Sequence, residues 1–192
     1  MRTFLVVGSQ AATAPFNLNG LPSAGRMDVL CRCVGQALCI SHGVRRDTRL
    51  YLLLLGPPNP PKALHIRGDR VRYLGPDERN IAGLIRRALD DDADDSWRMS
   101  TPGVFVARRD LAGLLDELSI PVMYLHEAGV DIRDADVPGD CLWTLGDHGG
   151  LPPICRDVVE SRAEKTVALS PLSLQADQCI TLVHNELDRR QQ

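Results

Sequence analysis

The sequence predicts an α/β domain in which a mostly parallel sheet is covered by helices on both faces. In the second half of the chain, short apolar segments alternate with longer segments whose apolar residues recur at helical spacing. Some strand segments are apolar along their whole length, as at residues 50–55, which is typical of strands with both faces buried. Because parallel neighbours need a crossover connection, this alternation favours parallel pairing.

The elements expected in the first half follow from apolar spacing and from the positions of glycine and proline. In chain order they are a strand at 3–8, a loop at 9–25, a helix at 27–41, a strand at 48–55, a proline-rich loop at 56–61, a hairpin with strands at 63–67 and 70–74, and a helix beginning at 76–79. The first helix has Asp28 in its first turn and Gly43 after its end, as helix termini prefer. Prolines exclude helix and central strand from 56–61, and the Gly-Asp pair at 68–69 supplies the hairpin turn.

The second half repeats strand and helix more regularly. In chain order we expect a connection at 96–102, a strand at 104–107, a helix at 110–118, strands at 121–125 and 142–145, a helix at 152–162, a strand at 166–169 and a final helix at 175–190. With 192 residues, of which 44% are hydrophobic, the chain has the size and core of one domain. We therefore treat residues 1–192 as a single domain.

Composition argues against a membrane protein and against a metal site. No apolar run approaches the roughly 20 residues that a membrane-spanning helix needs. The N-terminus carries Arg2 before a short apolar run and then Gly8, which suits a first strand better than a signal peptide, so we expect a cytoplasmic protein. The six cysteines include no pair with the two-residue gap common in zinc sites, so we expect reduced thiols and no metal.

Arginine provides most of the positive charge. Of the 22 basic residues only Lys62 and Lys165 are lysines, and the formal net charge is −3. Because the planar guanidinium fork matches phosphate oxygens, the arginine clusters favour an RNA partner, although a solvated surface would give the same composition. Acidic residues gather at 90–95, and since they would repel phosphate we expect this segment to point away from any RNA.

Three expected strands end in loops of unusual sequence, at 124–129, 145–150 and 168–174. Ligands of open parallel sheets bind beyond the carboxyl ends of the strands. None of the three loops has the G-x-G-x-x-G pattern of a phosphate-binding loop. Free backbone donors and acceptors beside apolar side chains suit a flat, uncharged ring such as adenine better than a phosphate. Together the loops resemble a pocket for S-adenosylmethionine.

Further sequence blocks carry a resemblance over essentially the whole chain. They lie at 25–33, 41–47, 56–61, 76–79, 100–103, 169–172 and 179–185. With these blocks in this order, the chain resembles the archaeal tRNA (pseudouridine(54)-N1)-methyltransferases of the SPOUT superfamily. The resemblance implies a SPOUT-type α/β fold with a deep C-terminal trefoil knot, in which residues 1–99 carry RNA-facing elements and residues 100–192 form the knotted cofactor-binding half. It also implies a homodimer with active sites at or near the subunit interface.

The resemblance further implies a reaction and a cofactor pocket. The enzyme would methylate N1 of pseudouridine at position 54 in the T-loop of tRNA, with S-adenosyl-L-methionine as methyl donor and S-adenosyl-L-homocysteine as product. By position, the pocket would comprise Leu125, Gly146, Leu169, Ser170, Pro171, Leu172, Ser173, Leu174 and Cys179. Gly146 would let the backbone approach closely.

Cys179 and Asp77 are the expected catalytic residues. Cys179 lies near the start of the last expected helix, where the helix dipole can lower the pKa of a thiol; alternatively it is a small buried residue that packs the helix. Direct methyl transfer requires no enzyme nucleophile, so a covalent role for Cys179 is disfavoured. Asp77 could accept the proton that leaves pseudouridine N1, or could stabilise a helix N-terminus. Asp47 is the second candidate carboxylate, although it could equally orient the arginines before it.

The remaining candidates concern RNA and the loop after the strand at 142–145. Five arginines are expected to contact RNA phosphates or, alternatively, to form ion pairs: Arg26, Arg32, Arg45, Arg46 and Arg79. Asp147 and His148 could be an acid–base pair, but we favour a role in shaping their loop. Two other functions stay open: the same chemistry on ribosomal RNA, as in a sister family, and a non-catalytic knotted RNA-binding assembly factor.

Overall fold

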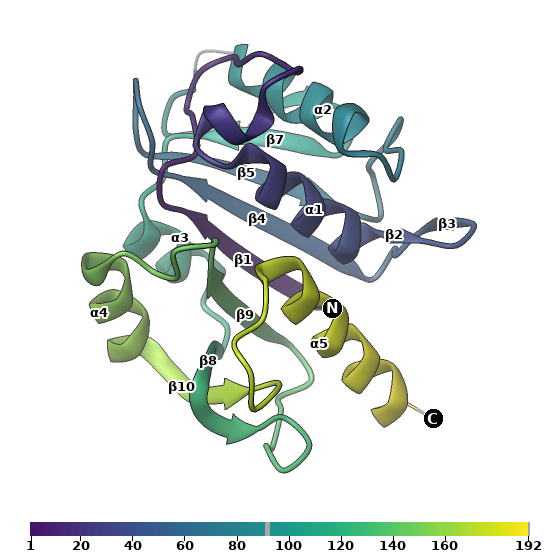
Figure 1. Cartoon of the computed structure of the whole chain (residues 1–192), viewed down its shortest axis with the longest axis vertical. Coiled ribbons are helices and arrows are strands. Elements are labelled where there is room, and N and C mark those ends of the chain that lie inside the picture. The colour runs from purple at the N-terminus through teal and green to yellow at the C-terminus, as the bar shows by residue number, and fades with distance from the viewer. Residues whose placement is uncertain (91–92, 192) are drawn as a thin grey trace.

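The computed structural model describes residues 1–90 and 93–191. In chain order the strands are β1 (Arg2–Gly8), β2 (Cys39–Ile40), β3 (Gly43–Val44), β4 (Thr48–Leu54), β5 (Lys62–Arg67), β6 (Arg98–Thr101), β7 (Val104–Ala107), β8 (Val122–Asp131), β9 (Cys141–Gly146) and β10 (Ala163–Ala168). The helices are α1 (Met27–Leu38), α2 (Glu78–Asp90), α3 (Leu111–Leu118), α4 (Pro153–Arg162) and α5 (Ala176–Arg190), with a short 3-10 helix, η1 (Leu21–Ala24), before α1. Figure 1 shows their arrangement.

One eight-stranded sheet forms the centre of the molecule, with the strand order β10-β8-β9-β1-β4-β5-β7-β6. The five strands from β10 to β4 are parallel, whereas β5, β7 and β6 pair antiparallel. The predicted α/β fold with a mostly parallel sheet is therefore confirmed. Central strand β1 is buried along its whole length, because it pairs with β4 on one side and β9 on the other and helices cover both faces.

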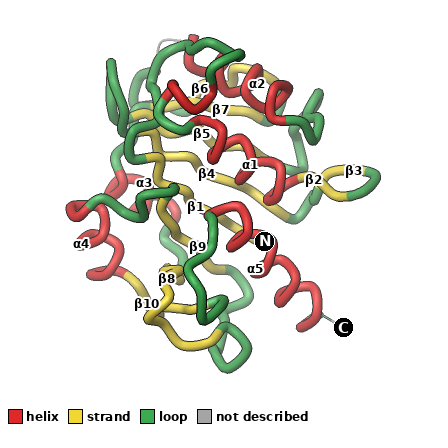
Figure 2. Tube along the Cα trace, in the orientation of Figure 1, coloured by secondary structure: helices red, strands yellow, loops and turns green. Residues whose placement is uncertain are grey.

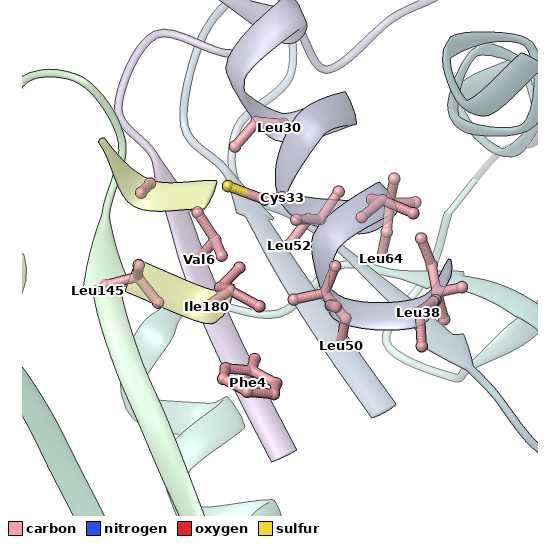
Figure 3. Packing of buried hydrophobic residues seen from close by; sticks show 14 of the residues in the cluster. Phe4, Val6, Leu30, Cys33, Leu38, Leu50, Leu52, Leu64, Leu145 and Ile180 are labelled. Atoms are coloured by element: carbon pink, nitrogen blue, oxygen red, sulfur yellow. The ribbon is translucent and has the colours of Figure 1, made fainter. Parts of the chain in front are cut away.

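Alternate residues of the central strands face two separate hydrophobic clusters. Phe4 and Val6 of β1 face the layer that contains α1, α2 and α5, whereas Leu5 and Val7 face α3 and α4. This follows from the two-residue period of a strand. Figure 3 shows the first cluster, in which Val6 lies near Cys33 of α1 and Ile180 of α5. Figure 2 shows the helices on the two sides of the sheet.

The last helix returns across the sheet to lie beside the first one, although some 140 residues separate them (Figure 1). Buried His184 of α5 joins the two: its Nε2 lies 3.0 Å from the carbonyl oxygen of Ala37, and its Nδ1 lies 3.1 Å from Nη1 of Arg2. Burial, with the nearby charges of Arg45 and Arg2, lowers the pKa of His184 to about 4. The neutral ring therefore fixes α5 against α1 and β1, whereas the deep trefoil knot stays a prediction.

Three sequence-based expectations were wrong. Residues 70–74 form no strand, because both edges of β5 are already paired, with β4 and with β7. The segment 96–102 contains a strand, β6, because β7 offers it a free edge. The first helix ends at Leu38, and the residues after it form the small β2–β3 hairpin. Each error concerns strand pairing, which local apolar spacing does not specify.

The described residues include neither a membrane-spanning helix nor a metal-binding cluster. In residues 1–90 and 93–191, no helix is both long and apolar enough to cross a membrane. The same part of the chain contains no group of three or more His, Cys, Asp or Glu side chains arranged to hold a metal ion.

Candidate functional site

A pocket of about 650 Å³ lies at the carboxyl ends of β9 and β10 and beside residues 124–127 of β8, near the N-terminal ends of α1 and α5. Strand β8 continues to Asp131, so the expectation that this strand ends at residue 125 was wrong. Its walls combine apolar side chains from these three strands with the backbone of the loops that follow β9 and β10. The lining residues outside the predicted set include Arg26, Val29, Tyr124, His126, Glu127, Leu145, Asp147, His148, Arg156, Val167 and Gln175. The strand ends form one pocket because β8, β9 and β10 lie side by side and run in the same direction.

Eight of the nine residues that the resemblance implied for cofactor binding line this pocket. They are Leu125, Gly146, Leu169, Ser170, Leu172, Ser173, Leu174 and Cys179. Pro171 is not among the lining residues and lies in the turn between two of them. The Oγ atom of Ser170 accepts a hydrogen bond from the backbone N–H of Leu172 at 3.1 Å, which holds this turn. Leu172 is 72% exposed on the pocket rim.

Gly146 is required by the close approach of its own loop. A Cβ atom at this position would lie 2.1 Å from the carbonyl carbon of Gly150 and 2.5 Å from the backbone nitrogen of Leu151. No side chain fits at such distances without a backbone shift. We expected Gly146 to give a ligand access to the backbone, but the close neighbour is the chain that folds back after β9.

Asp147 shapes the loop, as the favoured interpretation expected. Its Oδ2 atom accepts hydrogen bonds from the backbone N–H of Ser9 at 2.7 Å and from the Ser9 hydroxyl at 2.8 Å. Its Oδ1 atom accepts the N–H of Gly149 at 2.9 Å, and Nδ1 of His148 lies 3.5 Å from the same oxygen. The buried carboxylate therefore ties the loop after β9 to the loop after β1.

Cys179 is the fourth residue of α5 and lines the pocket. The expectation that the helix dipole lowers its pKa was wrong. Burial is the largest effect and, together with the charge of Asp177, it raises the pKa of the thiol to about 11. The backbone hydrogen bond that favours the thiolate is the smaller effect. At neutral pH Cys179 is therefore a protonated, compact side chain in the pocket wall.

Arg26 lines the pocket, whereas it was expected only as a phosphate contact. It precedes α1 in the left-handed backbone conformation, with φ 61° and ψ 41°, directly after Gly25 with φ 69°. A left-handed conformation is unfavourable for a residue with a Cβ, by about 1–2 kcal/mol. The guanidinium is held by two bonds to the buried carboxylate of Asp28, at 3.0 and 2.9 Å. These hydrogen bonds lower the pKa of Asp28, so the pair is charged on both sides.

Arg32 sits behind this pair and contacts three carboxylates. Its Nη1 lies 3.2 Å from Asp28 and 3.5 Å from Glu78, and its Nε lies 3.7 Å from Asp177. It thereby connects the first turns of α1, α2 and α5. Because these carboxylates occupy its guanidinium, Arg32 acts as an ion-pair residue in the single chain. This agrees with the alternative interpretation and not with a phosphate contact.

Asp77 precedes α2 and caps it. Its Oδ1 atom accepts the backbone N–H of Asn80 at 2.8 Å, which is the bond of a helix N-cap. Asp77 is not among the residues that line the pocket, and the neighbouring Arg79 bonds through Nη1 to Asn19 at 2.6 Å. The structural alternative for Asp77 is therefore realised, and its catalytic role stays a prediction.

Arg45 and Arg46 lie before the N-terminal end of β4. Arg45 makes two bonds to Asp188 of α5, at 3.1 and 2.7 Å, and Arg46 bonds to the carbonyl oxygens of residues 68–69. Asp47 lies 3.3 Å from Nε of Arg2. The pocket lies at the opposite end of the sheet, so the seven residues of β4 place these arginines roughly 20 Å from it. Within one chain they do not border the pocket.

The acidic segment was expected to point away from RNA. Residues 91–92 lie outside the described residues, but the carbonyl oxygen of Asp94 accepts the N–H of Arg108 at 2.7 Å, after β7. Strand β7 belongs to the antiparallel part of the sheet and lies four positions from β9 in the strand order. The described acidic residues therefore lie well away from the pocket.

Several pocket residues were missed by sequence reasoning. Glu127 lies in the block at 124–129 that the sequence marked as unusual, which is a signal that could have identified it. Arg156 in α4 and Gln175 before α5 carry no comparable signal, because their approach depends on where the helices pack.

Comparisons with known proteins agree with this geometry. The chain is 44% identical over 195 residues to the tRNA (pseudouridine(54)-N(1))-methyltransferase of Methanococcoides burtonii, covering 98% of this chain and 96% of the relative. It is 43% identical over 193 residues to the protein of that name from Methanocella arvoryzae, covering 99% and 100%. Among solved structures, Archaeoglobus fulgidus Nep1 bound to S-adenosylhomocysteine matches with a TM-score of 0.68 at 15% identity, over 99% of this chain and 98% of that one.

That structural likeness shows the fold. A second solved structure, the SpoU methyltransferase AviRb from Streptomyces viridochromogenes in complex with AdoMet, matches with a TM-score of 0.50 at 15% identity, over 98% of this chain and 57% of that one. The model of one protein family matches residues 1–192, the whole chain. The chain therefore belongs to the family described as "Putative SAM-dependent RNA methyltransferase".

Proposed function

We propose that this protein transfers a methyl group from S-adenosyl-L-methionine to N1 of pseudouridine at position 54 in the T-loop of tRNA. The observation that carries the proposal is the pocket formed by three neighbouring parallel strands, which unites eight of the nine implied cofactor residues. Relatives at 43–44% identity over nearly the full chain bear the name of this activity and support the same substrate.

The pocket fits the proposed cofactor in size and chemistry. About 650 Å³ is within the range of small-molecule sites. Leu125, Leu169 and Leu174 provide apolar surface for the two faces of adenine, and the free backbone at the strand ends can bond to its edge. Arg26 and Arg156 provide positive charge for a carboxylate. When bound, the cofactor supplies an electrophilic methyl group, and the chain's own residues then orient the RNA base at about 3–3.5 Å from it.

A homodimer belongs to this proposal. Two large apolar side chains lie exposed near the pocket: Leu172 on its rim, 72% exposed, and Ile154 at the start of α4, 75% exposed. Such residues favour burial against another surface, and a second copy of the chain would provide it. A partner subunit would also explain how Arg45 and Arg46, which lie far from the pocket of their own chain, could contact the same RNA. We place the activity in the cytoplasm because tRNA is the proposed substrate.

The experiment that tests the substrate compares two RNAs. The protein is incubated with S-adenosylmethionine carrying a labelled methyl group and with either a tRNA containing pseudouridine 54 or a small-subunit ribosomal RNA fragment containing pseudouridine. Label on the tRNA alone would support the proposal. Label on the ribosomal fragment alone would overturn the tRNA assignment, and no label on either, with no binding of S-adenosylhomocysteine at tens of micromolar, would favour a non-catalytic RNA-binding protein.

A further inference from the structure

The proposed reaction needs a proton acceptor, because N1 of pseudouridine carries a hydrogen that must leave when the methyl group arrives. Asp77, the candidate from sequence, caps α2 and does not line the pocket. The acceptor is therefore to be sought among the titratable groups that do line it. These are Arg26, Tyr124, His126, Glu127, Asp147, His148, Arg156 and Cys179.

Most of these groups are unsuited to accept a proton. The arginines are already protonated, and Cys179 and Tyr124 hold their protons because burial raises the pKa of both. Both oxygens of Asp147 are occupied by the donors of Ser9 and Gly149. Nδ1 of His126 accepts the backbone N–H of Ala128 at 3.1 Å. Nδ1 of His148 lies 3.5 Å from Asp147, which leaves Nε2 as the one nitrogen of this ring that could accept a proton.

Glu127 is the remaining carboxylate in the pocket wall. It belongs to residues 124–127 of β8, all four of which line the pocket. The residue is exposed, and its contact in the pocket is a long one, 3.5 Å from the hydroxyl of Ser173 to Oε2. Its carboxylate therefore lies in the pocket wall, open to solvent and to an incoming base.

We propose that Glu127 is a catalytic residue that accepts the N1 proton of pseudouridine. This inference rests on the proposed function. As the bond from N1 to the methyl carbon forms, the methyl–sulfur bond breaks and its electron pair remains on sulfur, which becomes an uncharged thioether. The proton from N1 passes to an Oε atom of Glu127, which becomes a neutral carboxylic acid and later returns the proton to water.

The test is Glu127→Gln, which keeps the size of the side chain and removes the proton acceptor. At saturating cofactor and tRNA, the single-turnover rate of methyl transfer is expected to fall by about 100-fold or more. The dissociation constant of S-adenosylhomocysteine should stay within twofold. The pH profile should also change: the unaltered protein reaches a plateau, whereas the variant keeps gaining rate towards alkaline pH, where solvent removes the N1 proton. Glu127→Asp should keep the plateau at a reduced rate.

Glu164→Gln is the matched control, because this glutamate is exposed on edge strand β10 and outside the pocket lining. It should behave as the unaltered protein. A Glu127→Gln rate within threefold of normal, with an unchanged pH profile, would overturn the inference while leaving the proposed function intact. So would tenfold weaker binding of S-adenosylhomocysteine with a normal rate at saturation, since Glu127 would then hold the cofactor. If the unaltered protein methylates no pseudouridine, the proposed function fails and this inference fails with it.

Discussion

Replacing Asp147 with alanine should destabilise the protein and weaken its pocket together. Asp147 is 7% exposed, and its carboxylate accepts three hydrogen bonds of 2.7–2.9 Å. Hydrogen bonds to a charged group contribute roughly 1.5–3 kcal/mol each. The N–H of Gly149 can turn to water, and Ser9 is only partly buried, so we expect a loss of about 2–4 kcal/mol in the free energy of unfolding.

The measurement is thermal unfolding followed by circular dichroism, combined with titration of S-adenosylhomocysteine. For a chain of this size, about 2–4 kcal/mol corresponds to a fall in Tm of roughly 4–16 °C. Asp147 fixes the loop at residues 147–150. Without it the loop is less ordered, so S-adenosylhomocysteine must order the loop when it binds to the variant. Ordering even one residue costs about 1 kcal/mol, or roughly fivefold in affinity.

Asp134→Ala is the control, since Asp134 is exposed in the turn after β8 and does not line the pocket. It should move the Tm by less than about 2 °C, as expected of a surface substitution. If Asp147→Ala also leaves both the Tm and the affinity unchanged, then Asp147 neither holds the loop nor supports the pocket, and the reasoning is refuted.

Three further predictions follow from single contacts. Gly146→Ala should abolish measurable cofactor binding, because its Cβ would lie 2.1 Å from the carbonyl carbon of Gly150; normal affinity by calorimetry would contradict this. Stability should fall as the pH drops from about 6.5 to about 4, by about 3 kcal/mol through His184 alone, since the unfolded chain binds a proton in this window and the folded chain does not. His184→Gln should flatten that part of the urea-unfolding profile, and an unchanged slope would refute it. Arg45→Ala combined with Arg46→Ala should weaken tRNA binding and flatten its salt dependence; an unaltered slope would show that these arginines do not contact RNA.

Much of the parallel half of the fold could be predicted because local apolar spacing reveals its helices. The helices starting near 110, 152 and 175 lie where the sequence indicated. The antiparallel edge could not, because β6 is defined by its partner β7 rather than by its own composition. For the same reason residues 70–74, although they alternate suitably, form no strand once both edges of β5 are paired.

The position of the pocket loops could be predicted, because the backbone of the sheet determines it. The directions and pKa values of individual side chains could not. The loops after β9 and β10 follow directly from strand ends in one sheet, so their residues converge in the pocket. The direction of Arg26 depends on two successive left-handed residues before α1, which no spacing rule indicates. The pKa of Cys179 depends on burial, which outweighs the helix N-terminus that the sequence suggested. The dimer and the knot remain predictions.

The central claim is tested most directly by nucleoside mass spectrometry. A tRNA with pseudouridine at position 54 is incubated with the protein and with S-adenosylmethionine carrying a labelled methyl group, beside the same tRNA with uridine at that position. The account predicts labelled N1-methylpseudouridine from the first tRNA and no label from the second. Label on another nucleoside, or equal label on both tRNAs, would contradict it.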